Sequence, residues 1–561
     1  MQYSKLVSIY QKLGATTKTL EKTKILSDFL NSVPEKELEE VVLLLQGLAF
    51  PEYDDRKLGL GTQLAIKAIA STGGTSINDV KQLWTKIGDL GETAQQVIGT
   101  KKQATLFSQS LTISKVIQNL QKLAVLEGNG TVDRKVSLLK ELLSSAKGAS
   151  AKYIIRTCLS DLRIGIGEGT LRDSIASAFC VSKDAVQTSY NLTTDFGEVA
   201  QLAKIGESAL NKSKVTIGKP IKVMLYQKAT DLANAFERVG KPAAFEYKID
   251  GFRLQIHRKG NQIWLFTRRQ EDVTKQFPDI VDNVKKHIKA DKFIIDAEVI
   301  GIDKKTGKWL PFQDISQRIR RKYDIEEIVK KIPVIVNIFD VLYMDGQSMI
   351  LKSFKERRDT LEKTVKSVKD KFVIVKEIIT SSEKEAKQFY EESLAKGNEG
   401  IMAKNLDAEY KPGSRVGYGV KVKPIMETLD LVIVGAEWGT GKRGGWLSSF
   451  ILACKDKDGS FLEIGKMGTG IKEKEEMGVS FEELTRMIKP LITSETGKTV
   501  RIKPNIVVEV AYEEVQKSPT YNSGFALRFP RLVRLRLDRK SKDANQLEDV
   551  EDLFANQRGR N

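Results

Sequence analysis

The chain of 561 residues has little cysteine and no long hydrophobic run. Its three cysteines, Cys158, Cys180 and Cys454, lie far apart in the sequence. Zinc knuckles and disulfide frameworks need cysteines at short paired spacings, so both are disfavoured, and a reducing cytoplasm fits better. No apolar run reaches the roughly 18 residues of a membrane span. Residues Met1 to Lys5 also lack the hydrophobic segment of a secretory signal. We therefore predict a cytoplasmic protein without a membrane segment.

Acidic residues are in deficit, with 73 Asp and Glu against 91 Lys and Arg. The net charge of +18 and the pI near 9.4 favour a polyanionic partner, nucleic acid first and an anionic membrane second. A charged surface that only maintains solubility is the alternative. Internal repeats and low-complexity linkers are also missing. Contents of 41% hydrophobic and 29% charged residues are typical of a globular protein, and the length predicts three or four domains.

Residues 1–210 are poor in aromatics, and their apolar residues recur at spacings of three and four, which predicts helices. The clearest examples are Leu43 to Ala49, Val136 to Ala146 and Tyr153 to Ala178. Between helical stretches, Asp161-Leu-Arg163-Ile-Gly165-Ile-Gly167-Glu-Gly169 combines glycines with an arginine. This segment suits either a phosphate contact or a simple helix-to-helix turn.

The pattern changes near Gly218, and from Phe245 to Lys423 short apolar strands alternate with charged helices, which predicts an α+β domain. The predicted strands are Ile263 to Thr267, Phe293 to Glu298, Val334 to Phe339, Gly400 to Lys404 and Val420 to Lys423; the predicted helices include Ile280 to Ala290 and Glu383 to Ala395. After Pro424, short strands with glycine turns predict a small β-barrel.

The stretch Phe245-Glu-Tyr-Lys248-Ile-Asp-Gly251-Phe-Arg253 begins as a strand of period two and carries a lysine among acids. A strand that ends in a lysine beside a glycine can aim an amine at a phosphate. Such a nucleophile must be neutral, so nearby cations or burial must lower its pKa. Taken alone, the stretch is equally typical of an exposed edge strand with a solvated Lys-Asp pair.

Charged residues also stand at the ends of the following strands. They supply acids for a hydroxyl or a divalent metal, cations for a triphosphate and an aromatic ring for a base. In chain order these groups are Phe266-Thr-Arg268-Arg269, Asp296-Ala-Glu298, Phe339-Asp340, Glu399-Gly-Ile-Met-Ala-Lys404 and Lys421-Val-Lys423. Together with Lys248, they indicate a nucleotide site that works through a covalent lysine.

This ordered series resembles the motifs of covalent nucleotidyltransferases, and within them those of ATP-dependent DNA ligases of the archaeal replicative type, related to eukaryotic DNA ligase I. The resemblance runs along essentially the whole chain. Its outer parts are the lead-in from Gly218 to Leu225 and the basic segment from Ser523 to Lys540. It implies an all-α DNA-binding domain (1–215), an α+β nucleotidyltransferase (adenylation) domain with antiparallel sheets (216–423) and a C-terminal OB-fold β-barrel (424–561).

The resemblance implies roles for single residues at the nucleotide. Lys248 would attack the α-phosphate of ATP and form lysyl-AMP. Glu246 would read the adenine, and Phe339 would stack on it. Arg253 and Arg268 would hold ribose and phosphate.

Further residues would handle phosphates and metal. Glu298 would contact the ribose and phosphate and, with Glu399, would lie near Mg²⁺. Arg415, Lys421 and Lys423 would grip the phosphates. This sequence departs from the family at Gly419, where many members carry tryptophan, and we expect Tyr418 to substitute for it in part.

The basic segment near the C-terminus would supply the remaining site residues. Arg528, Arg531 and Arg534 are the candidates to orient the pyrophosphate leaving group. The alternative is a positively charged strand face that grips DNA.

The implied enzyme seals nicks between a 3′-hydroxyl and a 5′-phosphate in duplex DNA, in replication, repair and recombination. It would use ATP and Mg²⁺, act as a monomer near the chromosome and contact mainly phosphates and sugars. An RNA ligase or capping guanylyltransferase is the nearer alternative, and the basic helical domain argues against it. A binding protein with a degenerate site is the more distant alternative. The absence of a cysteine-rich zinc segment argues against an NAD-dependent ligase.

A last segment, Gln103-Ala-Thr-Leu106-Phe107, resembles a sliding-clamp-binding peptide, with a glutamine, an aliphatic residue and an aromatic residue. The apolar pair would anchor in a pocket of the clamp. Alternatively, Leu106 and Phe107 begin the next helix and pack into the core.

Overall fold

A computed structural model describes residues 1–54, 56–100, 110–126, 128, 130–303, 305–307, 309–310, 312–321, 323–424, 428–439, 443–473, 476 and 478–556. The chain divides into two compact units. One comprises Met1–Ala386 and Met402–Lys421, and the other Lys387–Ile401 and Val422–Asn561. The resemblance implies three domains, and their two boundaries remain a proposal.

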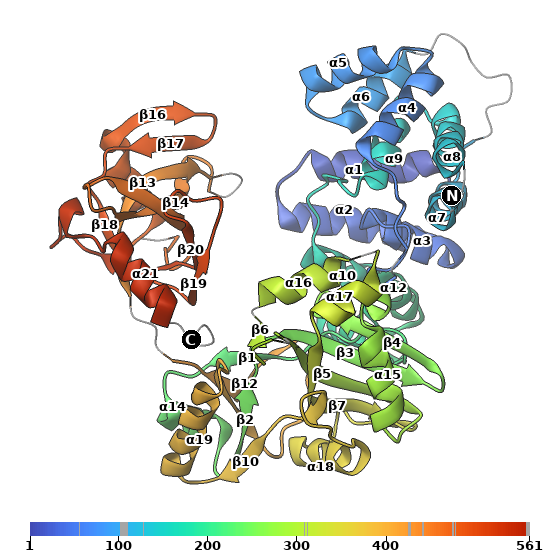
Figure 1. Cartoon of the computed structure of the whole chain (residues 1–561). Coiled ribbons are helices and arrows are strands. Elements are labelled where there is room, and N and C mark those ends of the chain that lie inside the picture. Colours follow the sequence, from blue (N-terminus) through green and yellow to red (C-terminus); the bar gives the residue numbers. More distant parts are fainter. Residues whose placement is uncertain are drawn as a thin grey trace. The chain divides into compact units, whose positions relative to one another are not determined.

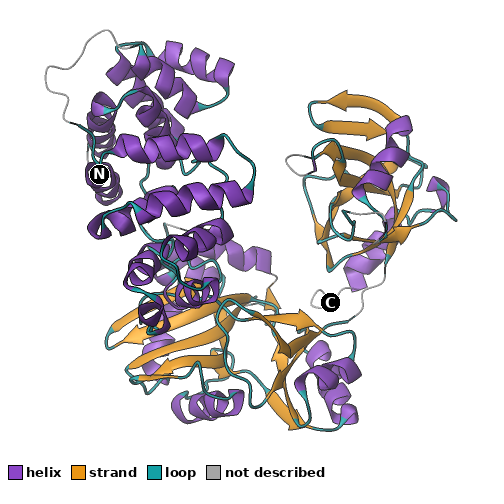
Figure 2. Ribbon diagram, turned by 180° about the vertical axis from the view of Figure 1, so that it is seen from behind, coloured by secondary structure: helices purple, strands orange, loops and turns teal. Residues whose placement is uncertain are grey.

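The first part of the chain is helical, as its apolar spacing predicts (Figures 1 and 2). Local signals fix the ends of several helices. One begins with a capping box between Ser76 and Asp79, and its C-terminal cap is Gly88 at φ 78°. The helices are α1 (Tyr3–Gly14), α2 (Thr19–Asn31), α3 (Glu35–Leu45), α4 (Thr62–Gly73), α5 (Ile77–Ile87), α6 (Leu90–Gly99), α7 (Ile113–Val125), α8 (Thr131–Ser145), α9 (Gly148–Cys158), α10 (Glu168–Ala178), α11 (Lys183–Thr193), α12 (Phe196–Ile205) and α13 (Glu207–Asn211).

The arginine-glycine segment between α9 and α10 is a helix-to-helix turn. Arg163 has a φ of 55° there, and its guanidinium pairs with Asp161 at 2.6 Å and Asp89 at 2.8 Å. Lys22 donates hydrogen bonds to the carbonyl oxygens of Ile164 and Gly165. These contacts give the arginine and the turn a structural function.

The middle of the chain forms two sheets with helices around them (Figure 1). One sheet has the strand order β1-β12-β11-β2-β10. The other has the order β4-β3-β5-β7-β8, with β6 beside β5 and β9 beside β7. Strands β3, β4, β5 and β7 pair antiparallel, while β1 pairs parallel to β12 and β9 parallel to β7. The predicted α+β class with antiparallel sheets is confirmed.

The elements of this region are β1 (Leu225–Lys228), α14 (Leu232–Val239), β2 (Ala243–Lys248), β3 (Phe252–Lys259), β4 (Gln262–Thr267), α15 (Pro278–His287), β5 (Lys292–Ile302), β6 (Trp309–Leu310), α16 (Phe312–Arg320), α17 (Ile325–Lys331), β7 (Val334–Met344), β8 (Gln347–Ser348), α18 (Phe354–Thr364), β9 (Phe372–Ile374), β10 (Glu377–Thr380), α19 (Glu383–Ala395), β11 (Gly400–Asn405) and β12 (Arg415–Val422).

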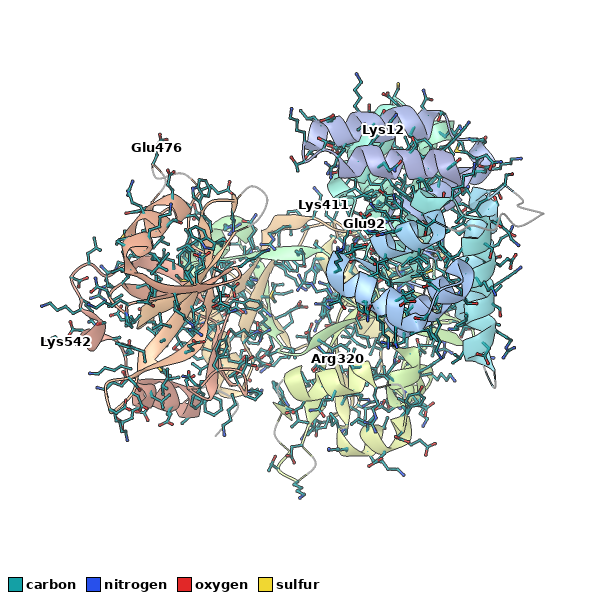
Figure 3. The ribbon with its side chains drawn as sticks, turned by 90° about the horizontal axis from the view of Figure 1, so that it is seen from above. Lys12, Glu92, Arg320, Lys411, Glu476 and Lys542 are labelled. Carbon is teal, nitrogen blue, oxygen red and sulfur yellow. The ribbon has the colours of Figure 1, made fainter. Side chains whose placement is uncertain are left out.

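The C-terminal part is rich in strands, as predicted, around a core that includes Phe450, Ile464 and Val508. Glu476 and Lys542 project outward from it (Figure 3). Its elements are β13 (Leu429–Trp438), β14 (Leu447–Lys455), β15 (Phe461–Met467), α20 (Phe481–Ile488), β16 (Ile492–Thr496), β17 (Thr499–Ile502), β18 (Val507–Ala511), β19 (Glu514–Lys517), β20 (Phe525–Arg528), β21 (Arg531–Leu535) and α21 (Leu547–Asn556). Within the described part of the chain, no helix has both the length and the apolar character of a membrane span.

Candidate active site

Lys248 is the last residue of β2, an interior strand of the five-stranded sheet. Phe245 and Glu246 on this strand are both buried, while Lys248 is half-buried. The exposed edge strand is therefore excluded. Both faces of β2 are covered by protein. The period-two pattern therefore marks one apolar face and one polar face, and the polar face is buried instead of exposed to solvent.

Gly251 allows the chain to pass close to a neighbouring strand directly after Lys248. A Cβ at this position would lie 2.3 Å from the carbonyl oxygen of Val299 in β5. No side chain fits there without moving β5 or the turn. The glycine of the Lys-x-Asp-Gly pattern thus fixes the path from β2 into β3.

Glu246 is 2% exposed, and two cations hold its carboxylate. Oε2 lies 2.5 Å from Nζ of Lys404, and Oε1 lies 3.3 Å from the guanidinium of Arg358. Burial by itself would lower the pKa of Lys404, but Glu246 beside it raises that pKa above the ordinary value. Lys404 therefore stays charged and compensates Glu246 inside the protein.

Glu377 lies opposite Glu246 in the pairing of β10 with β2. Burial, followed by the charge of Glu246, raises the pKa of Glu377 to about 7. A raised carboxyl pKa stabilises the fold at low pH, and this stability is lost as the pH rises from the ordinary value of 4.5 through 7. We therefore expect the free energy of unfolding to fall over this range, by up to about 3 kcal/mol.

The measurement is chemical denaturation from pH 4.5 to 8 with wild type and Glu377→Gln. The variant has no carboxyl group at this position, so its stability should depend less on pH over this range. Glu383→Gln, at an exposed acid in the first turn of α19, is the control. Equal pH slopes in wild type and Glu377→Gln would contradict the expectation.

Arg253 is fixed by neighbours on several elements. Its guanidinium lies 2.5 Å from Asp296 and donates hydrogen bonds to the carbonyl of Met224 and the hydroxyl of Tyr410. Burial by itself would lower the pKa of Arg253, but Asp296 raises it above the ordinary value. Its Nε is buried without a hydrogen-bond partner among the described residues.

Phe339 is half-buried between two cations. Its ring centroid lies 5.2 Å from the Arg253 guanidinium and 5.4 Å from the Lys404 ammonium. The next residue, Asp340, has a structural role instead. It forms a two-pronged ion pair with Arg357, at 2.7 and 3.2 Å, and both side chains are 1% exposed. Asp340 is therefore a structural acid.

The other predicted residues lie on several elements. Glu298 is half-buried on β5, across from Arg253 in β3. Arg268 and Arg415 are exposed, after β4 and at the start of β12. Lys421 is half-buried near the end of β12.

Glu399 and Lys423 form an ion pair at 2.9 Å, and both are mostly buried. Lys423 also lies 4.0 Å from Glu513. Glu399 therefore already has a cation beside its carboxylate.

Gly419 leaves room for an aromatic ring from another strand. A Cβ at this position would lie 2.2 Å from Cε1 of Tyr226 in β1. Burial raises the pKa of Tyr226 to about 12, so its hydroxyl remains protonated. The ring against Gly419 is thus that of Tyr226, while Tyr418 donates a hydrogen bond to the carbonyl of Glu409.

The three candidate arginines near the C-terminus differ in their partners. Arg528 pairs with Glu514 at 3.4 Å, and Arg534 pairs with Glu509 at 2.6 Å. Arg531 is exposed and has no acidic partner within the part of the chain that the structure describes. Of the three, Arg531 is the one available for an external anion.

Sequence reasoning assigned no role to Arg357, Arg358 and Tyr410, which build the site, and it counted Lys404 among the cations for phosphate rather than as the partner of Glu246. Lys404 is the last residue of the motif Glu399 to Lys404, so its place in that motif could have indicated that it belongs to the site. The two arginines lie side by side in a charged helix, α18, where their burial has no sequence signature.

Comparison with known proteins shows to which family this chain belongs. The model of the "ATP dependent DNA ligase domain" matches residues 223–423, that of the "DNA ligase N terminus" matches 2–176, and that of the "ATP dependent DNA ligase C terminal region" matches 443–539. A DNA ligase of Nanoarchaeum equitans is 48% identical over 563 residues, covering 100% of this chain and 99% of the relative. The chain belongs to the ATP-dependent DNA ligase family. A DNA ligase of Thermococcus fumicolans is 42% identical over 99% of this ligase and 98% of the relative.

A solved structure named Pmar-Lig_PreS3 aligns with a TM-score of 0.53 at 17% identity, over 95% of this ligase and 99% of that chain, which shows a shared fold. The family and its relatives confirm the predicted activity, an enzyme that seals DNA nicks with ATP. The predicted clamp-binding residues Gln103, Leu106 and Phe107 lie outside the described residues.

Proposed function

We propose that this ligase works through Lys248 as its nucleophile, in three displacements at phosphorus. The Lys248 amine attacks the α-phosphorus of ATP; a P–N bond forms and the bond to pyrophosphate breaks. The 5′-phosphate of the nick then takes the AMP from lysine, which regains its amine. Finally the 3′-hydroxyl attacks the activated 5′-phosphorus, a phosphodiester forms and AMP leaves. Positioning and charge neutralisation dominate such reactions.

The observation that carries this proposal is the place of Lys248, at the end of an interior strand two residues after the buried Glu246. Because Lys404 and Arg358 fix Glu246, its carboxylate is oriented before a nucleotide arrives, and we assign it to adenine recognition. Phe339 supplies a ring surface for the base. The test is mass spectrometry after incubation with ATP: the wild-type chain should gain one AMP, and peptide mapping should place it on Lys248.

Mg²⁺ fits the acids that are present. Among the described residues, no three His, Cys, Asp or Glu side chains form a metal-binding group. Magnesium is usually held by one or two carboxylates together with substrate phosphates and water, so a full protein cage is not needed. Glu298 is the proposed carboxylate, and Glu399 would contribute once Lys423 releases it. When bound, the metal would neutralise phosphate charge.

Arg268, Arg415, Lys421 and Lys423 are proposed as the phosphate contacts, alongside Nε of Arg253. The nick would be sealed in the course of replication, repair and recombination. We also propose that the ligase acts as a monomer on duplex DNA. Sealing assays with DNA or RNA strands and with ATP or GTP separate it from an RNA ligase and from a capping enzyme.

Arg531→Ala is expected to fail mainly in the formation of lysyl-AMP, by roughly 10²–10³-fold, because orientation of pyrophosphate matters only in that step. Single-turnover adenylation and sealing of a pre-adenylated nick measure the two halves of the reaction separately. Lys542→Ala, at an exposed cation outside the three candidates, is the matched control. Normal adenylation with weak binding of nicked DNA would instead identify Arg531 as a DNA contact.

The peptide around Phe107 is proposed to bind a sliding clamp. Phe107→Ala should then lose binding to the cognate clamp while its thermal stability is unchanged. A stability loss of about 3 kcal/mol or more, as for a truncated core phenylalanine, would show that Phe107 belongs to the core.

A further inference from the structure

Three polar side chains on β3 lie against the segment that leads into β1. Arg253, Gln255 and His257 share one face of this strand, because successive side chains of a strand point to opposite faces. Gln255 is 2% exposed and His257 is 0% exposed. Of the three, only Arg253 has a place in the proposed reaction. The other two are buried polar groups whose role the structure has to explain.

The lead-in segment, residues 218–224, forms a strap over this face of β3. The backbone N–H of Gly218 donates to Nδ1 of His257 at 3.1 Å. The backbone N–H of Ile221 donates to Oε1 of Gln255 at 2.7 Å. The strap therefore holds both side chains through its main chain.

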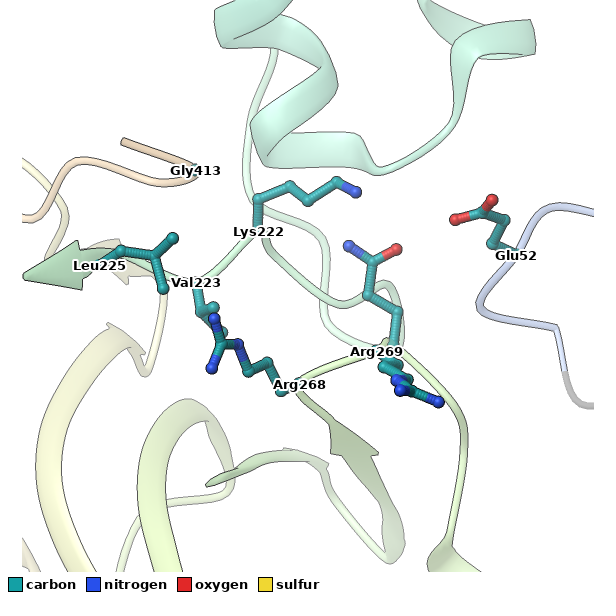
Figure 4. A pocket seen from close by; sticks show the side chains of 8 residues that line it. Glu52, Lys222, Val223, Leu225, Arg268, Arg269 and Gly413 are labelled. Carbon is teal, nitrogen blue, oxygen red and sulfur yellow. The ribbon is translucent and has the colours of Figure 1, made fainter. Parts of the chain in front are cut away.

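The strap is itself held by the end of helix α11. Thr194 donates a hydrogen bond to the carbonyl of Pro220 at 2.9 Å, and the N–H of Lys222 donates to the carbonyl of Asn191 at 2.9 Å. The side chain of Lys222 extends in the direction of Glu52, beside a cavity of about 390 Å³ (Figure 4). Because it is bonded to α11 as well as to β3, the strap is a fixed support for the β3 side chains.

The hydrogen bonds on this face of β3 have only one consistent direction. A backbone N–H can only donate, so Nδ1 of His257 accepts from Gly218, and we assign the ring proton to Nε2. Burial lowers the pKa of His257 to about 3, so the ring is neutral and has this single N–H. Nε2 then donates to Oε1 of Gln255 at 2.9 Å. With two donors on Oε1, the amide nitrogen of Gln255 faces Asp296, and it donates to Oδ1 at 3.2 Å.

Asp296 connects this network to Arg253. Its Oδ2 lies 2.5 Å from the guanidinium and also accepts a hydrogen bond from the hydroxyl of Tyr410 at 2.9 Å. Both oxygens of the carboxylate are therefore bonded, and its rotation would break bonds on both. A buried polar network whose members are all bonded is rigid, so the orientation of Gln255 determines that of the guanidinium.

We propose that Gln255 and His257 are positioning residues for lysyl-AMP formation, which align the Arg253 guanidinium through Asp296. The proposal rests on the proposed function, because it takes Arg253 as a contact of the nucleotide. A guanidinium that is aligned in advance stabilises the charge that develops on phosphate without having to reorient. A misaligned guanidinium still attracts the triphosphate before the reaction. Loss of alignment should therefore lower the rate constant of adenylation more than the affinity for ATP.

Gln255→Met keeps the length of the side chain but removes the donor to Asp296. In single-turnover adenylation of the full-length ligase, we expect its maximal rate constant to fall roughly 10- to 100-fold. The ATP concentration that gives half the maximal rate should change by less than about threefold. A merely structural role would instead lower the fraction of chains that accept AMP, because unfolded chains do not react, and would leave the rate constant unchanged.

Gln255→Glu tests the bond to Asp296 through its dependence on pH. At low pH the new carboxyl group is protonated and can donate to Asp296, as the amide does. Once ionised, it repels Asp296 and competes for Arg253, while His257 stays neutral. The ratio of its adenylation rate constant to that of wild type should fall as the pH rises from about 5.5 to about 8.5. Over this range, the ratio for Gln255→Met should stay constant.

Gln262→Glu is the matched control, since it makes the same change at an exposed glutamine of the neighbouring strand β4. Its adenylation rate constant should equal that of wild type at each pH. A ratio that falls equally with pH in Gln262→Glu and Gln255→Glu would contradict the proposal, because the effect would then come from the added charge alone.

His257→Phe keeps a ring but removes its donor and its acceptor. We expect its rate constant to fall roughly three- to tenfold, less than for Gln255→Met, because Ile221 still donates to Gln255. His257→Gln can place an amide N–H near the position of Nε2, and it should recover most of the rate. Equal losses in the two variants would contradict the role of His257.

Wild-type rate constants in both Gln255→Met and His257→Phe would overturn the proposal. So would full additivity of Gln255→Met with Arg253→Lys in a double-mutant cycle, since a residue that acts through the guanidinium must lose its effect when the guanidinium is removed. Failure of the wild-type ligase to place AMP on Lys248 would contradict the proposed function instead, before any variant is compared.

Discussion

Replacement of Lys248 by alanine is expected to abolish lysyl-AMP formation and to reduce nick sealing from ATP on the order of 10⁴-fold or more. The reason is covalent: no other group at the end of β2 can form the phosphoramidate. Sealing of a nick that already carries AMP should survive in part, because the last step uses the 3′-hydroxyl and not the lysine amine. Radiolabelled AMP transfer and sealing of a pre-adenylated duplex measure the two activities.

Lys241→Ala is the matched control for this prediction. Lys241 precedes the same strand, is exposed and pairs with Glu383 at 3.5 Å, so its loss should leave both activities unchanged. Lysyl-AMP at wild-type levels in Lys248→Ala would refute the assignment of the nucleophile. Loss of pre-adenylated sealing to the same extent as adenylation would show that Lys248 also positions the DNA.

Asp340→Asn is expected to lower the free energy of unfolding by about 3–5 kcal/mol, because it leaves a buried guanidinium without a counter-charge. Arg357 is 1% exposed, and its other hydrogen bonds go to neutral carbonyl groups of Lys352 and Ala408. Among the described residues, only Asp340 offers it a carboxylate at hydrogen-bond distance. Chemical denaturation measures the loss directly.

The double variant Asp340→Leu with Arg357→Met tests whether the cost comes from the broken pair. Replacement of a whole buried ion pair by apolar side chains is often neutral. The double variant should therefore recover most of the lost stability. A double variant as unstable as Asp340→Asn would show that Asp340 acts through another contact, and unchanged stability in Asp340→Asn with lost adenylation would return it to the catalytic site.

The fold class was predictable because burial leaves a periodic trace in the sequence. Spacings of three and four predict the helical character of residues 1–210, and apolar runs such as Val334 to Phe339 coincide with real strands. The bounds of two predicted helical stretches were wrong: Leu43 to Ala49 runs past the end of α3 at Leu45, and Tyr153 to Ala178 contains the turn between α9 and α10. No periodic signal in the sequence indicates that the middle strands divide into two sheets. This division depends on pairings between distant segments, such as Arg253 with Glu298, and periodicity carries no information on these.

The candidate site was also predictable only in part. The order of charged residues after apolar strands indicates a lysine-based nucleotide site, since the chemistry requires those residue types. The partners of these residues could not be read from the sequence. Arg253 is largely committed to Asp296, and Glu399 to Lys423, because burial of a charge requires an opposite charge nearby.

From the sequence alone came the class of each region, the family, and Lys248 as the proposed nucleophile. These properties depend on residue type and on spacing along the chain. Only the tertiary structure decided which charges serve the fold and which remain for ligands. Asp340 forms half of a buried ion pair, and the ring of Tyr226 occupies the space beside Gly419. Among the described residues, the buried Oε1 of Gln270 has no hydrogen-bond partner. The physical reason is that desolvation and pairing depend on neighbours in space, which the fold brings together from positions far apart in the sequence.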